Sequence, residues 1–149
     1  MTLTDHTDFI DSQLDAGIAA RNAGELVRAK AIFCEVLHAV GNDYTKGKAI
    51  ALSELGYIAR CQKQLDEARE WLAACVQVSP RFELGSVQLF FTLLELKQVT
   101  QALEESVRFL RLRNSTHYRE IFAEGVREGL DDVQQSLADE ARILLARFV

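Results

Sequence analysis

Small residues recur along this chain at fixed intervals. Gly17 and Ala29 stand at positions i and i+12, and Gly56 and Ala68 are related in the same way. Ala68 and Ala102 are 34 residues apart. Ala29 and Ala68 are 39 residues apart, which is the same interval with five residues inserted. A fixed period of this length indicates a repeating structural unit, in which neighbouring units stack and share one core.

The spacing of apolar residues predicts about eight helices, paired as four antiparallel hairpins. Good helix formers recur throughout, and the chain has only one proline and eight glycines to interrupt them. Thr7 is the expected N-cap of the first helix, and the last hairpin is expected to turn at Gly129, between helices at about 118–128 and 130–147. The five extra residues are placed in the loop GNDYTKGK. The hairpins cover about residues 8–40, 44–79, 82–112 and 116–147 of a single domain, 1–149.

One stretch, ELGYIARCQKQLDEAREWLAACVQVSP at 54–80, resembles a unit of the tetratricopeptide repeat, a helix-turn-helix of about 34 residues. Leu55, Gly56, Ala68 and Pro80 stand at the signature places of that family. Small residues suit these places because the two helices of a hairpin cross closely. The resemblance covers about residues 10–114, and it implies an all-α, right-handed superhelix of about three repeats followed by a degenerate hairpin.

Two parts of the chain depart from the repeat pattern. In the third hairpin Phe90 occupies the place of the glycine, although Ala102 keeps its position. Beyond Ser115 the last hairpin matches in helix length alone, and atypical end units are expected because they must cover the core. A helical bundle without repeats, in which the spacing is a coincidence, is the alternative.

Charge and motifs do not favour an enzyme, a metal site or a nucleic-acid binder. Seventeen basic and 22 acidic residues give a formal net charge of −5, which repels a phosphate backbone. His6, His38 and His117 are scattered without ligand spacing, and neither a phosphate-binding loop nor a nucleophile elbow occurs. We therefore expect no enzymatic activity, no metal, no cofactor and no nucleic-acid partner.

Apolar runs are far shorter than the roughly 20 residues that cross a bilayer, and the N-terminus does not resemble a secretory signal. A cytoplasmic protein that does not insert into membranes is the expectation. Cys34, Cys61 and Cys75 have no CxxC spacing and lie within helical patterns. They are expected to be reduced thiols that pack as small core residues.

The resemblance to tetratricopeptide repeats implies a partner-binding groove along the first helix of each hairpin. Carried over position by position, its residues are Leu14, Ile18 and Arg21, then Ser53, Tyr57 and Arg60, then Val87, Phe91 and Leu94. The set is mostly apolar and aromatic, with Tyr57 as an anchor and arginines as rim donors. No asparagine stands at the place that Ile18, Tyr57 and Phe91 share, so binding of a partner's C-terminal carboxylate is not expected. Burial of the last three as ordinary core is the alternative.

These features predict a protein-protein interaction module that binds a partner protein or peptide in an apolar and aromatic groove. The alternative is a dedicated one-partner protein, such as a bacterial secretion-type chaperone or a toxin-neutralising immunity protein, because an acidic helical protein suits a basic or aggregation-prone client. Trp71 is expected at a contact between repeats or at a partner hot spot. The apolar end ILLARFV, 143–149, either caps the array or forms a homodimer through the C-terminal helix.

Overall fold

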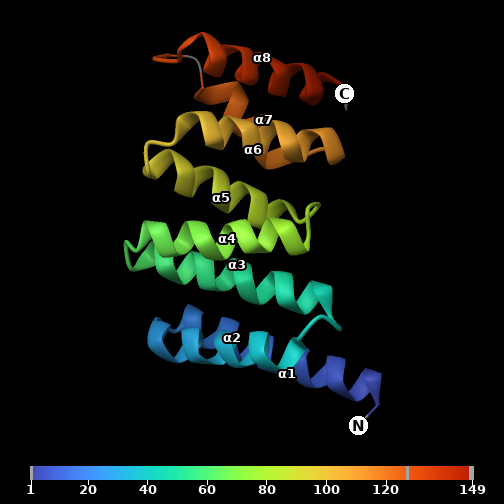
Figure 1. Ribbon diagram of the computed structural model, residues 1–149. Helices are drawn as coiled ribbons and strands as arrows, with labels where there is room; N and C mark the ends of the chain where they lie inside the picture. The colour runs from blue at the N-terminus through green and yellow to red at the C-terminus, as the bar shows by residue number, and fades with distance from the viewer. Residues whose placement is uncertain (1, 127, 148–149) are drawn as a thin grey trace. The chain divides into compact units, whose positions relative to one another are not determined.

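Eight α-helices make up the regular structure of the part of the chain that the computed structural model describes, residues 2–126 and 128–147 (Figure 1). The chain divides into two compact units, Met1–Ser79 and Pro80–Val149. The first contains α1 (Leu3–Asn22), α2 (Leu26–Val40), α3 (Thr45–Cys61) and α4 (Leu65–Val78). The second contains α5 (Glu83–Glu95), α6 (Val99–Leu112), α7 (Thr116–Glu124) and α8 (Asp132–Ala146). The prediction of an all-α fold of about eight helices is confirmed.

The first helix begins earlier than predicted. Thr2 is its N-cap: the Thr2 side chain accepts a hydrogen bond from the Asp5 amide at 3.1 Å, and the Asp5 carboxylate accepts one from the Thr2 amide at 3.2 Å. This reciprocal pair is a capping box. The prediction of Thr7 as the N-cap is therefore wrong, because Thr7 lies inside α1, where its hydroxyl donates to the Leu3 carbonyl at 3.0 Å.

The last hairpin also differs from the prediction. Helix α7 ends at Glu124, about a turn earlier than predicted, and residue 127 of the predicted helix lies outside the described residues. Gly129 lies in the connection to α8 with a φ of 73°, a left-handed conformation that suits glycine. Asp131 then caps α8 in a second capping box, with Gln134.

Glycines in the first unit allow the helices of each hairpin to approach closely. A Cβ added to Gly17 on α1 would lie 2.7 Å from the Phe33 ring on α2, and one added to Gly56 on α3 would lie 2.5 Å from Leu72 Cγ on α4. Real Cβ atoms do not approach neighbours this closely, so a larger residue at either place would force Phe33 or Leu72 to shift. The predicted role of these glycines holds, but Gly56 contacts Leu72, which lies one helical turn beyond Ala68.

The turns inside three hairpins share one backbone conformation. Gly24, Lys63 and Lys97 have φ values of 80°, 60° and 63°, and the intervals between them are the same as those between the alanines above. The amide that follows each of them donates back into the first helix: Glu25 to Ala20, Gln64 to Ala59 and Gln98 to Leu93, at 2.9, 2.9 and 2.8 Å. The repeat spacing is thus also present in the local structure of the chain.

Aromatic rings replace the glycine contact in the second unit. Phe90, at the place of the glycine, is fully buried, and its ring centroid lies 5.5 Å from that of Tyr118 and 6.3 Å from that of Phe122, both on α7. The Phe90–Tyr118 pair is edge-to-face, and packing of this kind stabilises beyond the area that it buries. The third hairpin therefore departs from the repeat pattern because its first helix packs against α7 through aromatic side chains.

The C-terminal helix packs within the second unit. Helix α8 contacts α6 and α7, and Leu144 and Leu145 are only 5% and 6% exposed. Ile143, by contrast, is 61% exposed. Capping of the unit by this apolar end agrees with these contacts, whereas the homodimer stays a prediction; residues 148–149 of the apolar end lie outside the described residues.

Candidate functional site

The predicted groove residues of the first unit divide between its core and its surface. Leu14 and Ser53 are only 3% and 1% exposed, so they pack inside the unit. Ile18 is partly buried against the same core, and Arg60 is also half-buried. Tyr57 is 40% exposed and offers the largest apolar surface of the set in this unit.

Arg21 and Glu54 hold Tyr57 in place. The Arg21 guanidinium lies 5.1 Å from the centroid of the Tyr57 ring, and its Nη1 lies 2.8 Å from Glu54 Oε2. Burial raises the pKa of the Glu54 carboxyl, and the charge of Arg21 opposes that shift. Arg21 is therefore already engaged within the unit, so it supports the tyrosine rather than projecting freely as a rim donor. Glu54 is not among the groove residues predicted from the sequence, although its place one turn before Tyr57 on α3 puts both on one face.

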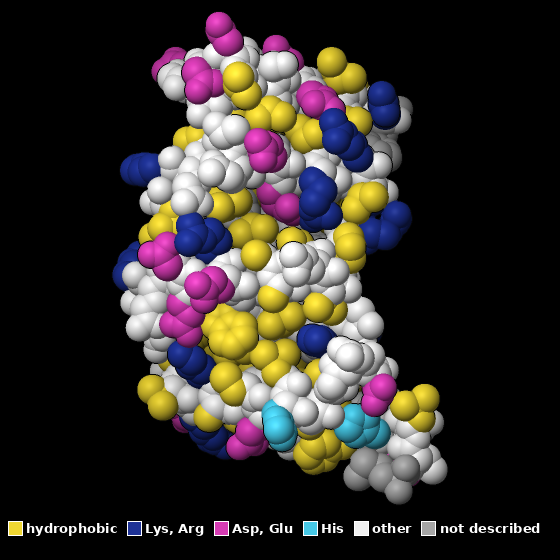
Figure 2. All heavy atoms as spheres, in the orientation of Figure 1, with side chains coloured by type: hydrophobic (Ala, Val, Ile, Leu, Met, Phe, Trp, Pro, Cys, Tyr) yellow, Lys and Arg dark blue, Asp and Glu magenta, His cyan; other side chains and the backbone are white. Residues whose placement is uncertain are grey.

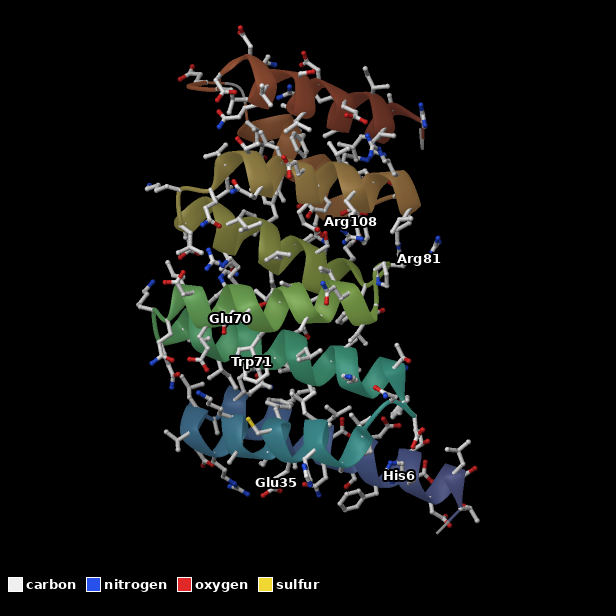
Figure 3. All side chains as sticks on the ribbon, viewed as in Figure 1. His6, Glu35, Glu70, Trp71, Arg81 and Arg108 are labelled. Atoms are coloured by element: carbon white, nitrogen blue, oxygen red, sulfur yellow. The ribbon has the colours of Figure 1, made fainter. Side chains whose placement is uncertain are left out.

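Trp71 lies on another face of the first unit, where Figure 2 shows apolar side chains gathered between α4 and α2, among acidic and basic groups. Figure 3 labels Trp71 beside Glu70 on α4 and shows Glu35 on α2. The Trp71 indole packs against the core of the unit and donates to Glu67 at 3.2 Å. Packing between hairpins thus accounts for much of its surface, and a role in partner binding stays a prediction.

A pocket of about 430 Å³ lies in the second unit, between α5 and α7. Three groove residues predicted from the third hairpin line it together: Val87, Phe91 and Leu94. The other described lining residues are Phe90, His117, Glu120, Ile121, Glu124, Gly125 and Val126. Val87 is only 6% exposed, at the back of the pocket, while Phe91 is 38% exposed at its surface. The pocket thus combines an apolar lining from α5 with polar groups from α7.

The charged groups of this pocket are mainly acidic. Glu120 and Glu124 are exposed on α7, and His117 lies on the same helix with its Nδ1 in a hydrogen bond to Glu83 of α5. Sequence analysis missed all of the lining residues on α7, because the last hairpin lacks repeat signatures from which its register could be predicted.

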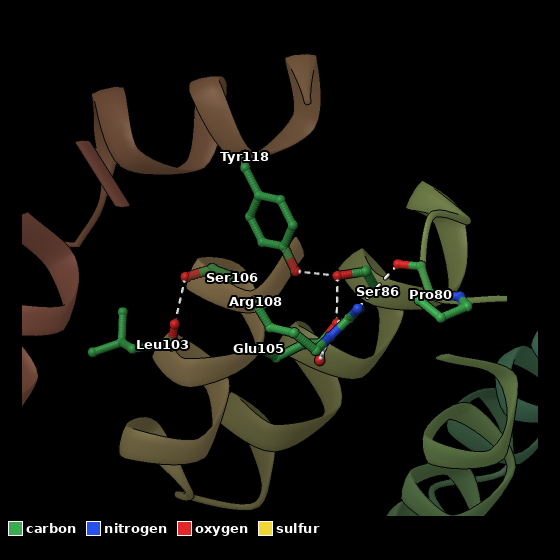
Figure 4. Close-up of polar contacts among 7 residues, drawn as sticks. All are labelled: Pro80, Ser86, Leu103, Glu105, Ser106, Arg108 and Tyr118. Carbon is green, nitrogen blue, oxygen red and sulfur yellow. Dashed lines mark hydrogen bonds and ion pairs between the residues drawn. The ribbon is translucent and has the colours of Figure 1, made fainter. Parts of the chain in front are cut away.

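Figure 4 shows a buried polar network that joins α7 to α5 and α6. The Tyr118 hydroxyl lies 2.8 Å from Ser86 Oγ, and the Ser86 hydroxyl donates to Glu105 Oε2 at 2.6 Å. Arg108 donates to both Glu105 oxygens, at 2.7 and 2.5 Å, and to the Pro80 carbonyl at 3.0 Å. Burial raises the pKa of the Tyr118 phenol far above its ordinary value. The hydroxyl therefore stays protonated and can donate to Ser86.

This network sets the position of the wall that α7 gives to the pocket. Tyr118 directly follows His117 in the chain, and Ile121 lies one turn further along α7. Because the Tyr118 side chain is anchored between α5 and α6, the neighbouring face of α7, on which His117, Ile121 and Glu124 lie, is turned to the pocket. The wall that α7 gives to the pocket is consequently supported by a buried, hydrogen-bonded polar cluster.

The described residues show no group of three or more His, Cys, Asp or Glu side chains that could hold a metal ion. Within the same residues, no helix combines the length and apolar character needed to cross a bilayer. The three cysteines are free. Only Cys75 is buried, which raises the pKa of its thiol to about 12, so the expectation of core packing is wrong for Cys34 and Cys61, which are exposed.

The hairpins, their shared turns and the repeat spacing define a tetratricopeptide-like helical fold, as predicted. No known family model and no curated protein matches the chain. Solved structures do: the crystal structure of the Sgt2 TPR domain from Aspergillus fumigatus is similar with a TM-score of 0.60 and 16% identity, covering 93% of this chain and 80% of that one. A MamA RS-1 double mutant is similar with a TM-score of 0.63 and 19% identity, covering 93% and 76%. At these identities the likeness shows the fold alone.

Proposed function

We propose that this chain is a non-enzymatic protein-protein interaction module that binds a partner peptide or protein. The observation that carries the proposal is the pocket between α5 and α7, which is lined by Val87, Phe91 and Leu94 and leaves Phe91 38% exposed. Concave apolar pockets with a few polar groups are the usual form of a binding site. A partly exposed aromatic ring beside such a pocket is the kind of residue that dominates binding energy in interfaces.

Each unit contributes its own surface to the proposal. In the first unit Tyr57, held by Arg21, is the exposed aromatic residue of the predicted set, and Ile18 and Arg60 complete that set around it. In the second unit Phe91 and Leu94 form the corresponding surface. Leu14, Ser53 and Val87 are buried, so we assign them to support of these surfaces rather than to direct contact.

The test is capture of partner proteins from native lysate by the tagged chain, compared between variants by mass spectrometry. Phe91→Glu places a charge beside the apolar pocket, and Tyr57→Glu does the same at the first surface. We expect each to weaken capture of the same partner and the double variant to abolish it, with an unchanged helical circular dichroism spectrum. Leu84→Glu is the matched control, because Leu84 also lies on α5, is 45% exposed and does not line the pocket. Undiminished capture by the folded double variant would refute the proposed surfaces.

A second candidate is a dedicated one-partner protein, such as a secretion-type chaperone or an immunity protein. The acidic groups around the pocket and the net charge of −5 favour it, since both suit a basic or aggregation-prone client. Tight one-to-one co-purification with a client that is insoluble or toxic alone would select this function over a general adaptor. In both versions of the proposal the protein is cytoplasmic and has neither a nucleic-acid partner nor a cofactor.

A further inference from the structure

We propose that the pocket between α5 and α7 binds a peptide segment in which a bulky apolar side chain lies next to a lysine or arginine. The inference rests on the proposed interaction function and specifies the chemistry of the partner. It follows from two features that meet at one place, an apolar pocket and a pair of carboxylates at its edge.

The apolar feature sets the size of what can enter. The pocket volume of about 430 Å³ lies at the lower end of the range of about 300–1,000 Å³ that is typical of ligand pockets. The α5 side chains lining it are all apolar, and Ile121 adds an apolar group from α7. Space of this size suits one or two large side chains of a peptide, such as leucine or phenylalanine, and the Phe91 ring is exposed to pack against them.

The acidic feature sets the charge of what can enter. Glu120 and Glu124 are four residues apart on α7, so they project from one face of the helix and one cation can approach both. Within residues 2–126 and 128–147 neither carboxylate forms an ion pair. Glu83 adds a third carboxylate nearby, although His117 pairs with it.

Charge complementarity distinguishes this partner from an acidic or a purely apolar one. A segment with Asp or Glu beside its apolar side chain would place like charges near Glu120 and Glu124, which is unfavourable. A segment with Lys or Arg there would gain two exposed ion pairs, which individually contribute little but which set specificity and speed of association. Because such pairs are screened by salt, binding of the basic segment should weaken as ionic strength rises.

Three short synthetic peptides of equal length test the proposal by isothermal titration calorimetry. The first is amphipathic with leucine and lysine, the second replaces lysine by glutamate, and the third replaces leucine by alanine but keeps lysine. We expect the leucine-lysine peptide to bind the unmodified protein about tenfold more tightly than the leucine-glutamate peptide, since two exposed ion pairs amount to roughly that factor. It should also bind more tightly than the alanine-lysine peptide, which keeps the ion pairs but loses the apolar contacts in the pocket. Equal binding of the leucine-glutamate peptide would overturn the proposal.

Charge reversal at the pocket edge provides the decisive comparison. The double variant Glu120→Lys with Glu124→Lys should bind the leucine-glutamate peptide more tightly than the leucine-lysine peptide. If that variant does not fold, Glu120→Gln with Glu124→Gln takes its place, and it should reduce the difference in affinity between the two peptides. Glu35→Lys with Glu70→Lys is the matched control, because it changes the net charge equally at two exposed residues of the first unit (Figure 3). If the control weakens binding as much as the pocket variants do, the peptide responds to net charge and the proposal is wrong.

The apolar half is tested in the same titration. Phe91→Ala should weaken binding of the leucine-lysine peptide several-fold, whereas Leu84→Ala on the same helix should leave it unchanged. Equal affinity of Phe91→Ala and the unmodified protein would show that the pocket is not the site, and would also overturn the inference.

Partner capture separates this inference from the proposed function. If Phe91→Glu abolishes capture of a native partner while the glutamine pair at 120 and 124 does not affect it, the interaction function stands and the basic character of the partner is wrong. If neither change affects capture, the proposed function fails as well.

Discussion

Replacing Tyr118 by phenylalanine removes one hydroxyl from the buried network that joins α7 to α5. The single proton of the Ser86 hydroxyl goes to Glu105, so Ser86 accepts its second hydrogen bond from Tyr118 at 2.8 Å. Both residues are fully buried, and the substitution leaves Ser86 without that donor. The free energy of unfolding at pH 7 should therefore fall by about 1–2 kcal/mol, the cost of a lost hydrogen bond and an unpaired buried group.

This difference should disappear in alkaline solution. Burial raises the pKa of Tyr118 above its ordinary value of 10.0, so above pH 10 the unfolded chain releases a proton that the native protein keeps. Fewer bound protons in the unfolded state mean that stability falls as pH rises, by up to about 1.4 kcal/mol per pH unit for one group. The variant has no phenol at this place and is spared that loss. The unmodified protein should thus lose its advantage near pH 11.

Urea unfolding followed by circular dichroism at pH 7 and at about pH 11 measures both effects. The buried thiol of Cys75, with its pKa raised to about 12, adds the same pH dependence to both proteins and cancels in the difference. Tyr57→Phe is the control at pH 7: Tyr57 is 40% exposed, so its replacement should change stability at that pH by less than about 0.5 kcal/mol. A stability difference for Tyr118→Phe that stays constant from pH 7 to pH 11 would refute this account of the buried phenol.

Two further substitutions test the packing and the turns. Gly56→Val should lower the free energy of unfolding in urea by about 2 kcal/mol or more, because even a Cβ would lie 2.5 Å from Leu72 Cγ. An unchanged free energy would show that α3 and α4 can separate at little cost. Lys97→Gly should stabilise the protein by about 0.5–1 kcal/mol, because Lys97 has a φ of 63° and the matching turn of the first hairpin has Gly24 at this place. A loss of stability would mean that contacts of the lysine side chain contribute more than the backbone strain costs.

Much of the architecture could be predicted because it depends on local signals that repeat. The hairpins expected at 44–79 and 82–112 correspond to α3 with α4 (Thr45–Cys61 and Leu65–Val78) and to α5 with α6 (Glu83–Glu95 and Val99–Leu112), since each is limited by a turn with a recognisable break. The place of Gly56 at a close helix crossing also followed from the spacing together with the resemblance to the repeat family. The N-cap of α1 was predicted wrongly as Thr7. An N-cap is favoured where the residue three positions later can return a hydrogen bond to it, and Asp5 does so for Thr2.

The site was harder to predict than the fold because it depends on contacts between distant residues. The groove positions on α5 do line one pocket, but the facing wall of that pocket belongs to α7, where no repeat signature sets the register. Tyr118 sets it instead, through a hydrogen bond to Ser86, 32 residues earlier in the chain. In the first unit, burial of Leu14 and Ser53 follows from how tightly α1 and α3 pack, which a position-by-position comparison with a family does not predict.

The packing of Trp71 makes the two units separately observable. It is the only tryptophan of the chain, its indole rests on the core of the first unit, and it donates to Glu67 at 3.2 Å. Its fluorescence emission therefore reports unfolding of the first unit, while circular dichroism reports helices of both. Coincidence of the two transitions would mean that the units fold as one cooperative body, and separate transitions would mean that the peptide pocket can open while the N-terminal hairpins remain intact.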